Sequence, residues 1–381
     1  LIANGVHLVG RSFKYHRPRG FFGAGVDEPY AIVQMNRNNE VDPNVRATEQ
    51  ELFEGLEAKS VNCWPNVDFD IGAINNFLGK FFPAGFYYKT FMWPKSFWYK
   101  VYEPIIRKAA GFGAASIKHD KEKYEHKYEY CDLLITGSGP SGLASAYAAA
   151  QNGAKVILAE DKSRFGGSLL TSEVTIGNQS GQEWAEKIIS ELKSMPNVVI
   201  KNRSQVFGYY DHNMLVMSER ISDHLPKTEK YIPKQRLWYI RAKEVIISSG
   251  SIERPLVFGN NDTPGVMLSS AAKEYLKIYG VLVGKKPLVF TNNDSGYETA
   301  IEFKKNGIDP IVLDTRKDPN SEIIKEAKDL NINIKPSHVV VAAKGYKKVN
   351  SADIGKISDD KKNISNIENI KCDCICVSGF W

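Results

Sequence analysis

Cysteine is scarce in this chain and never forms a redox pair. Five cysteines occur among 381 residues, none of them within the first 47 residues and none in a C-x-x-C arrangement. A disulfide framework is therefore not indicated, disulfide-reductase chemistry is excluded, and a reducing, cytoplasmic setting is favoured. The first 47 residues also cannot ligate an iron–sulfur cluster, because such clusters are held by cysteine thiolates.

Signals for membranes, nucleic acid and hydrolysis are missing as well. There is no apolar run of about 18 residues and no signal peptide, so we expect no membrane partner. A net charge of +6, dispersed along the chain, is too mild to indicate nucleic acid. Neither a G-x-S-x-G elbow nor an H-E-x-x-H helix is present, and no metal site is expected. No catalytic residue can be named from these patterns.

Both ends of the sequence look cut. The chain starts at Leu1 rather than at methionine, and it stops at Trp381 directly after an apolar strand. With 43% hydrophobic residues its length suits two or three globular domains. We expect a fragment of a longer polypeptide.

What is present is a complete dinucleotide-binding βαβ unit at residues 131–160. An apolar strand at 131–136 leads into a glycine-rich turn, helix formers follow at 143–151, and a second strand at 155–159 ends at Glu160. The turn carries the G-x-G-x-x-G fingerprint at Gly137, Gly139 and Gly142.

Each part of this unit has a physical reason. The glycines permit the tight turn, the close approach of the backbone to a pyrophosphate, and the packing of helix on strand. The helix N-terminus offers unpaired N–H groups to the phosphates. Glu160 stands 23 residues after Gly137, near the position of the acid that binds ribose hydroxyls. The sequence therefore predicts a bound dinucleotide, but this chemistry alone does not distinguish NAD from FAD.

A second βαβ unit begins near Lys286 and ends at Asp314. Its turn at 292–296 lacks the G-x-G-x-x-G fingerprint; Asn292 and Asn293 would crowd a pyrophosphate and Asp294 would repel it. We expect this unit to have Rossmann architecture without a dinucleotide. Between the two units the patterns predict a helix at 181–195, a strand at 198–201, a hairpin of 205–210 with 214–218, and strands at 236–241 and 243–249. The predicted fold class is α/β with nested Rossmann-type dinucleotide-binding domains, as in two-dinucleotide flavoproteins.

Three further segments carry weaker signals. A basic cluster within 11–19 is interpreted as a solvated loop, with an anion or partner contact as the alternative. Residues 118–130 are charged and are expected to be a linker. Cys372, Cys374 and Cys376 alternate along a strand and are expected on one buried face rather than at a metal.

Large aromatic residues are dense between 77 and 102. They are expected either to dock against another domain or subunit, or to wrap around the core of this chain itself. The residues are Phe77, Phe81, Phe82, Phe86, Tyr87, Tyr88, Phe91, Trp93, Phe97, Trp98, Tyr99 and Tyr102.

Four segments resemble the α subunit of heterotetrameric sarcosine oxidase. They are GVHLVGRSFKYHRPRG at 5–20, GAGVDEPYAIVQ at 23–34, VTIGNQSGQEWA at 174–185 and TNNDSGYETA at 291–300. Related α subunits serve opine oxidases, cyanide synthases and amino-acid dehydrogenases. Those relatives often keep cysteines near the N-terminus, so their absence here favours the sarcosine type.

The resemblance implies a division of the chain and a cofactor. It implies a ferredoxin-like remnant without a cluster at 1–50, an aromatic-rich connector and charged linker at 51–130, an NAD-binding Rossmann domain at 131–285, and a truncated second Rossmann-like domain at 286–381. NAD would be held without turnover. Besides Gly137, Gly139, Gly142 and Glu160, the resemblance places Ser141, Asp161, Lys162, Gly167, Ser168 and Val206 around it.

The resemblance also implies an assembly. Partner β, γ and δ subunits would complete an oxidase that acts on a small amine, with FMN and FAD on or beside a partner subunit. Tetrahydrofolate would bind in a C-terminal region beyond residue 381. An opine or amino-acid oxidase α subunit and a non-catalytic dinucleotide-binding scaffold remain the alternatives.

Overall fold

The structure is a computed structural model that describes the chain apart from residues 38–39, 80–84, 86–90, 92, 111–115, 227–230 and 361. It divides into two compact units. We call Glu51–Gly55 with His119–Ser251 the fingerprint unit, and Leu1–Gln50, Leu56–Lys118 and Ile252–Trp381 the composite unit. Within the described residues, no helix has the length and apolar character needed to cross a membrane.

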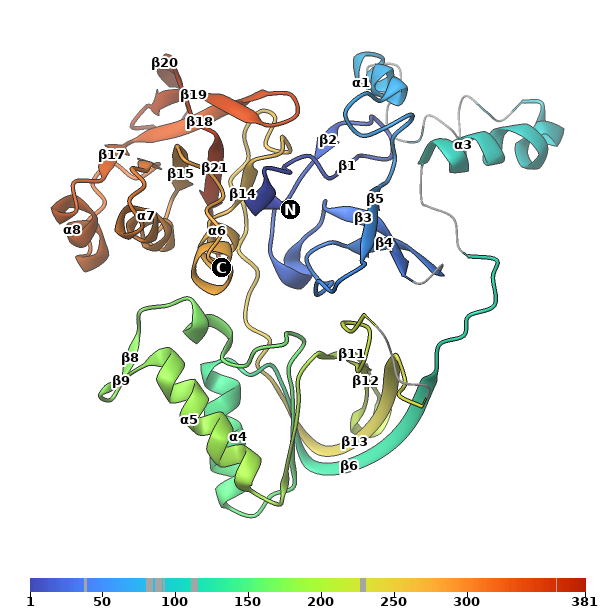
Figure 1. Ribbon diagram of the computed structural model, residues 1–381. Helices are drawn as coiled ribbons and strands as arrows, with labels where there is room; N and C mark the ends of the chain where they lie inside the picture. Colours follow the sequence, from blue (N-terminus) through green and yellow to red (C-terminus); the bar gives the residue numbers. More distant parts are fainter. Residues whose placement is uncertain are drawn as a thin grey trace. The chain divides into compact units, whose positions relative to one another are not determined.

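The fingerprint unit is built on a six-stranded sheet with strand order β10-β7-β6-β13-β12-β11. β10, β7, β6 and β13 run parallel to one another, and β13, β12 and β11 form an antiparallel meander. Figure 1 shows α4 and α5 together beside this sheet. The bounds are β6 Tyr124–Thr136, α4 Pro140–Gln151, β7 Val156–Ala159, α5 Gly181–Ser194, β10 Val198–Lys201, β11 Ser204–Tyr210, β12 Met214–Arg220 and β13 Gln235–Ile247, with short β8 Thr175–Ile176 and β9 Gln179–Ser180.

Apolar periodicity explains this packing. α4 and α5 bury Leu143, Ala146, Ile188 and Leu192 against strand residues such as Leu158. α5 starts with the capping box that its sequence encodes, since Ser180 and Glu183 each accept a hydrogen bond from the other's backbone N–H. The helices predicted at 143–151 and 181–195, the predicted hairpin and the strands predicted at 131–136, 155–159 and 198–201 are present.

The predicted linker at 118–130 is partly wrong, because β6 already begins at Tyr124. Its first half pairs residue by residue with β13, starting from Gln235 opposite Tyr124. This half is mostly exposed and shows no apolar alternation, so periodicity gave no strand signal. Aromatic contacts between the strands replace core burial: the rings of Tyr128 and Tyr239 stack with centroids 5.0 Å apart. The two strands predicted at 236–241 and 243–249 are one strand, β13, which pairs with β6 along its whole length.

The composite unit contains the second Rossmann sheet, which is parallel and ordered β14-β21-β15-β16-β17. A three-stranded antiparallel sheet, β18-β19-β20, accompanies it (Figure 1). The bounds are β14 Val266–Leu268, α6 Ser269–Tyr279, β15 Pro287–Thr291, α7 Ser295–Lys305, β16 Ile311–Asp314, α8 Glu322–Asp329, β17 Asn333–Pro336, β18 His338–Gly345, β19 Val349–Ile357, β20 Ile364–Ile370 and β21 Cys374–Ser378.

This sheet begins earlier in the chain than its sequence suggested. The proposed domain start at residue 286 lies after β14 and α6, although β14 pairs with β21. β14 has only three residues, and its partner lies about a hundred positions later, so no local pattern could reveal it. Cys374 and Cys376 share a buried face of β21 with sulfur atoms 3.7 Å apart, as predicted, whereas Cys372 precedes the strand and packs in the other core cluster.

The N-terminal part of the composite unit consists of small sheets and short helices. Its sheet has the order β4-β3-β5, so pairing extends past the proposed boundary at residue 50. The bounds are β1 Gly10–Arg11, β2 Pro18–Arg19, β3 Ile32–Arg37, β4 Glu40–Arg46, β5 Glu57–Ser60, α1 Ile74–Phe77 and α3 Glu103–Ala110. A buried carboxylate organises one loop: Glu28 accepts hydrogen bonds from the backbone N–H groups of Phe22, Gly23, Tyr30 and Ala31.

The basic cluster is not the solvated loop that we favoured. Arg11 is 3% exposed and donates to the carbonyl oxygen of Val67. Arg17 and Arg19 both pair with Asp262, and His16 binds Asp70 at 2.6 Å. These basic side chains hold the N-terminal segment to the rest of the composite unit. The acids lie dozens to hundreds of residues away, which is why the sequence interpretation missed them.

The aromatic stretch is exposed or half-buried where it is described, with Phe91, Trp98 and Tyr102 half-buried. Phe81, Phe82, Phe86, Tyr87 and Tyr88 lie outside the described residues. Of the others, Phe77 is 85%, Trp93 84% and Tyr99 83% exposed. The described rings therefore do not wrap the core of their own unit.

Candidate dinucleotide site

Two glycines of the fingerprint are required by the fold itself. Gly137 has a φ of 94°, and a Cβ there would lie 2.4 Å from the carbonyl oxygen of Ser248. A Cβ on Gly142 would lie 2.0 Å from the carbonyl oxygen of Gly137. Side chains at either position would force the first turn, or the strand end beside it, to move.

Gly139 is different, because a Cβ there would meet nothing within 4 Å. This residue is the N-cap of α4, which has Pro140 in its first turn and no side-chain capping bond. Free space therefore lies directly in front of a helix N-terminus, where N–H groups and the helix dipole favour an anion. The arrangement fits a pyrophosphate, as the fingerprint predicted.

Glu160 follows β7 and turns toward this glycine turn. Its Oε2 accepts the Ser138 N–H at 2.9 Å and the Ser138 hydroxyl at 2.5 Å, and its Oε1 accepts the Lys162 N–H at 3.0 Å. Burial and a hydrogen bond with the Asp161 carboxyl raise the pKa of Glu160 to about 7, although these three donors oppose the shift. Near neutral pH, this acid is poised between its charged and neutral forms.

The Gly166–Gly167 loop closes onto the same turn. The Gly166 N–H donates to the carbonyl oxygen of Ser138 at 3.1 Å and to its hydroxyl at 3.2 Å. A Cβ on Gly167 would come within 2.8 Å of the Gly139 Cα, so only glycine allows this approach. Gly167 and Ser168 are exposed.

The remaining predicted residues come from neighbouring segments. The start of β11 runs beside the end of β7: the Ser204 N–H donates to the Glu160 carbonyl at 2.7 Å. Val206 of this strand is half-buried, and Ser141 is exposed in the first turn of α4. The fold thus gathers the fingerprint, the segment from Glu160 to Lys162, the glycine pair and β11 in one place. Their contacts with a ligand stay predictions.

Two residues of the site were missed by sequence reasoning. Ser138 occupies the variable position of the fingerprint, which the motif leaves unspecified. Ser248 donates its hydroxyl to the carbonyl oxygens of Thr136 and Gly137, and so fixes the end of β6. The small residues that follow β13, Ser248 to Gly250, are the sequence signal that could have pointed to the second.

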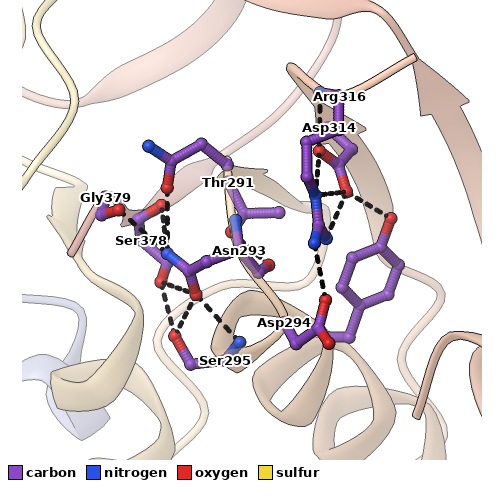
Figure 2. Close-up of polar contacts among 10 residues, drawn as sticks. Thr291, Asn293, Asp294, Ser295, Asp314, Arg316, Ser378 and Gly379 are labelled. Atoms are coloured by element: carbon purple, nitrogen blue, oxygen red, sulfur yellow. Dashed lines mark hydrogen bonds and ion pairs between the residues drawn. The ribbon is translucent and has the colours of Figure 1, made fainter. Parts of the chain in front are cut away.

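The corresponding turn of the second Rossmann unit is filled by its own side chains (Figure 2). Asn293 donates to the carbonyl oxygens of Ser378 at 3.4 Å and Gly379 at 3.0 Å, and accepts from the N–H and hydroxyl of Ser295. These contacts take up the space and the donor at the start of α7 that a pyrophosphate would need. The expected crowding by Asn293 is therefore visible in the structure.

The acid at the end of β16 is also neutralised. Asp314 is fully buried, accepts the Tyr297 hydroxyl at 2.8 Å and forms an ion pair with Arg316. Arg316 bonds Asp294 as well, so the residue expected to repel phosphate is itself paired (Figure 2). Hydrogen bonds and charge attraction to both acids raise the pKa of Arg316. Asp314 forms an ion pair with Arg316, and this cation would compete with a ribose hydroxyl for the carboxylate.

Comparisons with known proteins agree with this arrangement. The family described as FAD dependent oxidoreductase matches residues 132–207, and the 2Fe-2S iron-sulfur cluster binding domain family matches residues 1–63. A cluster does not fit here, since Cys63 is the only cysteine in that range. L-proline dehydrogenase from P. horikoshii has a similar fold, with a TM-score of 0.56 at 17% identity over 98% of this chain and 54% of its own.

Fold and site together define a chain with nested dinucleotide-binding domains of the flavoprotein type, as predicted. Sarcosine oxidase subunit alpha of Rhizobium meliloti (strain 1021) is 50% identical over 317 residues, which are 83% of this chain and 32% of that protein. The protein of the same name from Corynebacterium sp. (strain U-96) is 28% identical over 100% of this chain and 35% of its own length. The predicted resemblance to the sarcosine oxidase α subunit family is confirmed, and the chain is homologous to oxidoreductase subunits. It spans about a third of these relatives.

Proposed function

We propose that this chain is the dinucleotide-binding part of an oxidoreductase α subunit of the sarcosine oxidase type, and that its fingerprint unit holds NAD. One observation carries the proposal: free space at Gly139 faces the uncapped start of α4, with Glu160 beside it. The start of α4 can thereby bind an anion, and Glu160 beside it can bind a ribose hydroxyl.

The roles of the residues follow from their positions. Gly139 and the first N–H groups of α4 would contact the pyrophosphate, and Glu160 would accept a ribose hydroxyl. The exposed Gly167 and Ser168 would cover the phosphates, while Ser141, Asp161, Lys162 and Val206 would line the rest. A nicotinamide dinucleotide exchanges hydride where it turns over, but the resemblance implies that this one is bound without turnover. NADP should bind more weakly, because Glu160 and Asp161 would repel a 2′-phosphate.

The alternative cofactor at this site is FAD. The matching family at 132–207 supports the flavin class, and NAD rests on the resemblance. Nucleotide released from the purified protein by denaturation should run as NAD on a chromatogram, and calorimetric titration should give one equivalent of NAD. A released flavin, or a titration in which FAD binds and NAD does not, would replace NAD by FAD in the proposal.

The reaction and assembly of the whole protein are also proposals. The α subunit would join β, γ and δ subunits and demethylate sarcosine oxidatively to glycine, with FMN and FAD on or beside a partner. Peroxide would be the product of reoxidation, and tetrahydrofolate, bound beyond residue 381, would take the one-carbon unit. Co-expression of the longer α chain with its partners should give sarcosine-dependent peroxide, and this chain alone should give none. Peroxide from this chain alone would refute the subunit assignment.

The exposed aromatic rings supply the proposed contact with the flavin-bearing partner. Phe91 and Tyr102 pack with centroids 5.2 Å apart, and Trp93 and Tyr99 beside them are almost fully exposed. Phe91→Asp with Trp98→Asp should reduce co-purification of the partner subunits. Leu52→Asp is a matched control, because Leu52 is 84% exposed outside this stretch. Equal recovery from the double variant and the control would remove the interface.

Two other functions stay open. An α subunit of an opine or amino-acid oxidase or dehydrogenase would keep the same dinucleotide site, and its genes would lie beside different partner genes. A non-catalytic dinucleotide-binding scaffold is favoured by one observation: the second Rossmann turn is filled by Asn293, and Asp314 is neutralised by Arg316. Amine turnover by the complete assembly would exclude the scaffold.

A further inference from the structure

Ser138 joins three segments that meet at the fingerprint turn. Its side chain is fully buried, and its hydroxyl has a single proton, which it gives to Glu160 Oε2 at 2.5 Å. The hydroxyl oxygen accepts the Gly166 N–H at 3.2 Å. The backbone repeats both links, because the Ser138 N–H donates to Glu160 and the Ser138 carbonyl accepts from Gly166.

These links fix the parts of the site relative to one another. Gly139 is the next residue after Ser138 in the chain. Glu160 is hydrogen-bonded to Ser138, and Gly167 directly follows Gly166, which donates to Ser138. The proposed pyrophosphate contact, the ribose acceptor and the phosphate loop are therefore all linked through Ser138, by its backbone and by its hydroxyl group. Alanine at position 138 would have no hydroxyl to donate to Glu160. The residue type at this position therefore matters here, although the G-x-G-x-x-G fingerprint does not specify it.

We propose that Ser138 is a positioning residue, which aims the Glu160 carboxylate at the adenosine ribose and keeps it ionised for that contact. This inference rests on the proposed dinucleotide function of the site, and it holds for NAD and FAD alike because both carry this ribose. Ser138 itself need not touch the ligand.

The charge balance explains why one hydroxyl has such an effect. Burial and Asp161 raise the pKa of Glu160 to about 7, and the Ser138 side chain is the largest of the contributions that lower it. Loss of the hydroxyl would raise this pKa further, so Glu160 would be neutral at pH 7. A protonated carboxyl is a weaker acceptor for a ribose hydroxyl.

Other charged groups around Glu160 are already held by partners that the variant leaves in place. Arg220 of β12 donates to the Asp161 carbonyl at 2.9 Å, and Arg203 at the start of β11 is paired with Glu51. Lys201 at the end of β10 is paired with Glu219. Lys162 follows directly in the chain, and its N–H bond to Glu160 is a backbone contact.

The test compares Ser138→Ala with wild type by titration of NAD into the chain from pH 5.5 to pH 9, with FAD titrated in parallel. Wild-type affinity should rise with pH through about 7, because binding favours the ionised form of Glu160. Ser138→Ala should weaken binding at pH 7 by about tenfold, because Glu160 would then be protonated and a weaker acceptor for the ribose hydroxyl. The deficit should shrink toward pH 9, where Glu160 is ionised again.

Glu160→Gln and the double variant separate positioning from a general loss of structure. In the Glu160→Gln background, Ser138→Ala should have no pH-dependent effect. In the ligand-free protein, a carbon-13 carboxyl titration should show a higher pKa for Glu160 in Ser138→Ala. Ser138→Cys, which keeps the size and a weaker donor, should lie between wild type and alanine.

The outcomes distinguish this inference from the proposed function. If wild type binds NAD or FAD but Ser138→Ala has the same pH midpoint, or loses affinity equally at every pH, the positioning role is refuted while the site stands. An unchanged Glu160 titration in Ser138→Ala would refute it without any ligand. If wild type binds neither nucleotide, the proposed function fails, and the inference fails with it.

Discussion

The two βαβ units of this chain have the same plan but different turns. Each runs strand, turn, helix and strand, and each has an acid at the end of its second strand: Glu160 in the first and Asp314 in the second. In the first, glycine leaves room in front of the helix, and serine positions the acid. In the second, Asn293 occupies the turn and Arg316 neutralises the acid. The proposed dinucleotide site of the first unit thus rests on free space at a helix N-terminus and on an acid held by serine, and the described residues of the second unit supply neither.

The largest effect is expected where the second unit neutralises its buried acid with an ion pair. Arg316→Ala would leave Asp314 fully buried without its cation, and the unfolding free energy of the composite unit should fall by about 3 kcal/mol. Differential scanning calorimetry measures this change. Lys317→Ala is the matched control, because its pair with Asp359 is exposed and should contribute less than about 1 kcal/mol. Equal stability losses would mean that the Asp314 network is not essential to the second turn.

The next effect concerns the free space of the first unit. Gly139→Ala should leave the melting temperature unchanged, because the new Cβ has open space around it, but should weaken dinucleotide binding by about 1–3 kcal/mol through contact with the pyrophosphate. Gly296→Ala, whose Cβ would lie 2.6 Å from the Thr291 Cβ, should do the opposite: it should lower stability and spare affinity. Calorimetric titration and thermal melting of both variants are needed. Normal binding by Gly139→Ala would show that the pyrophosphate lies elsewhere.

A smaller effect should follow from emptying the second turn. Asn293→Ala removes the bonds to the Ser378 and Gly379 carbonyls, and it should destabilise the composite unit by about 1–2 kcal/mol. The binding stoichiometry should stay at one dinucleotide per chain, because Arg316 still neutralises Asp314. A second equivalent bound by the variant would show that Asn293 alone distinguishes the two turns.

The smallest effect is the pH dependence of stability that Glu160 introduces. Its pKa in the folded chain, about 7, lies above the ordinary value of 4.5, so the folded state holds the proton more tightly. The unfolding free energy of the ligand-free fingerprint unit should therefore fall as pH rises from 4.5 to about 7. Denaturant melts at several pH values would show this slope, and Glu160→Gln should flatten it. A slope that persists in Glu160→Gln would have to come from another group.

Local patterns were sufficient for most of the fingerprint unit. The turn, α4, β7, α5 and the hairpin of β11 and β12 were all predicted, because their apolar periodicity and turn residues lie within short windows. The first half of β6 was missed, since its stability comes from pairing with β13 and from stacked aromatic rings rather than from burial. β14 was missed because its partner β21 comes at the end of the chain.

Charged residues show where sequence reasoning was wrong. The basic cluster of Arg11, His16, Arg17 and Arg19 looked like a solvated loop, but the fold buries Arg11 and brings Asp70 and Asp262 to the others. A single sequence shows which side chains carry charge, but not which opposite charge will lie within 4 Å. Ion pairs between distant segments depend on the complete fold.

The sequence by itself determined that this chain contains two Rossmann units, that only the first carries a glycine fingerprint, and that Glu160 is its acid. These features depend on neighbours in the chain: glycine tolerates the turn, and an apolar strand leads directly to the acid. Only the tertiary structure decided that Ser138 positions Glu160, that Ser248 fixes the strand end, and that Arg316 neutralises Asp314 in the second unit. Such contacts join side chains across separate strands and loops, and they form only after hydrophobic burial has brought those segments together.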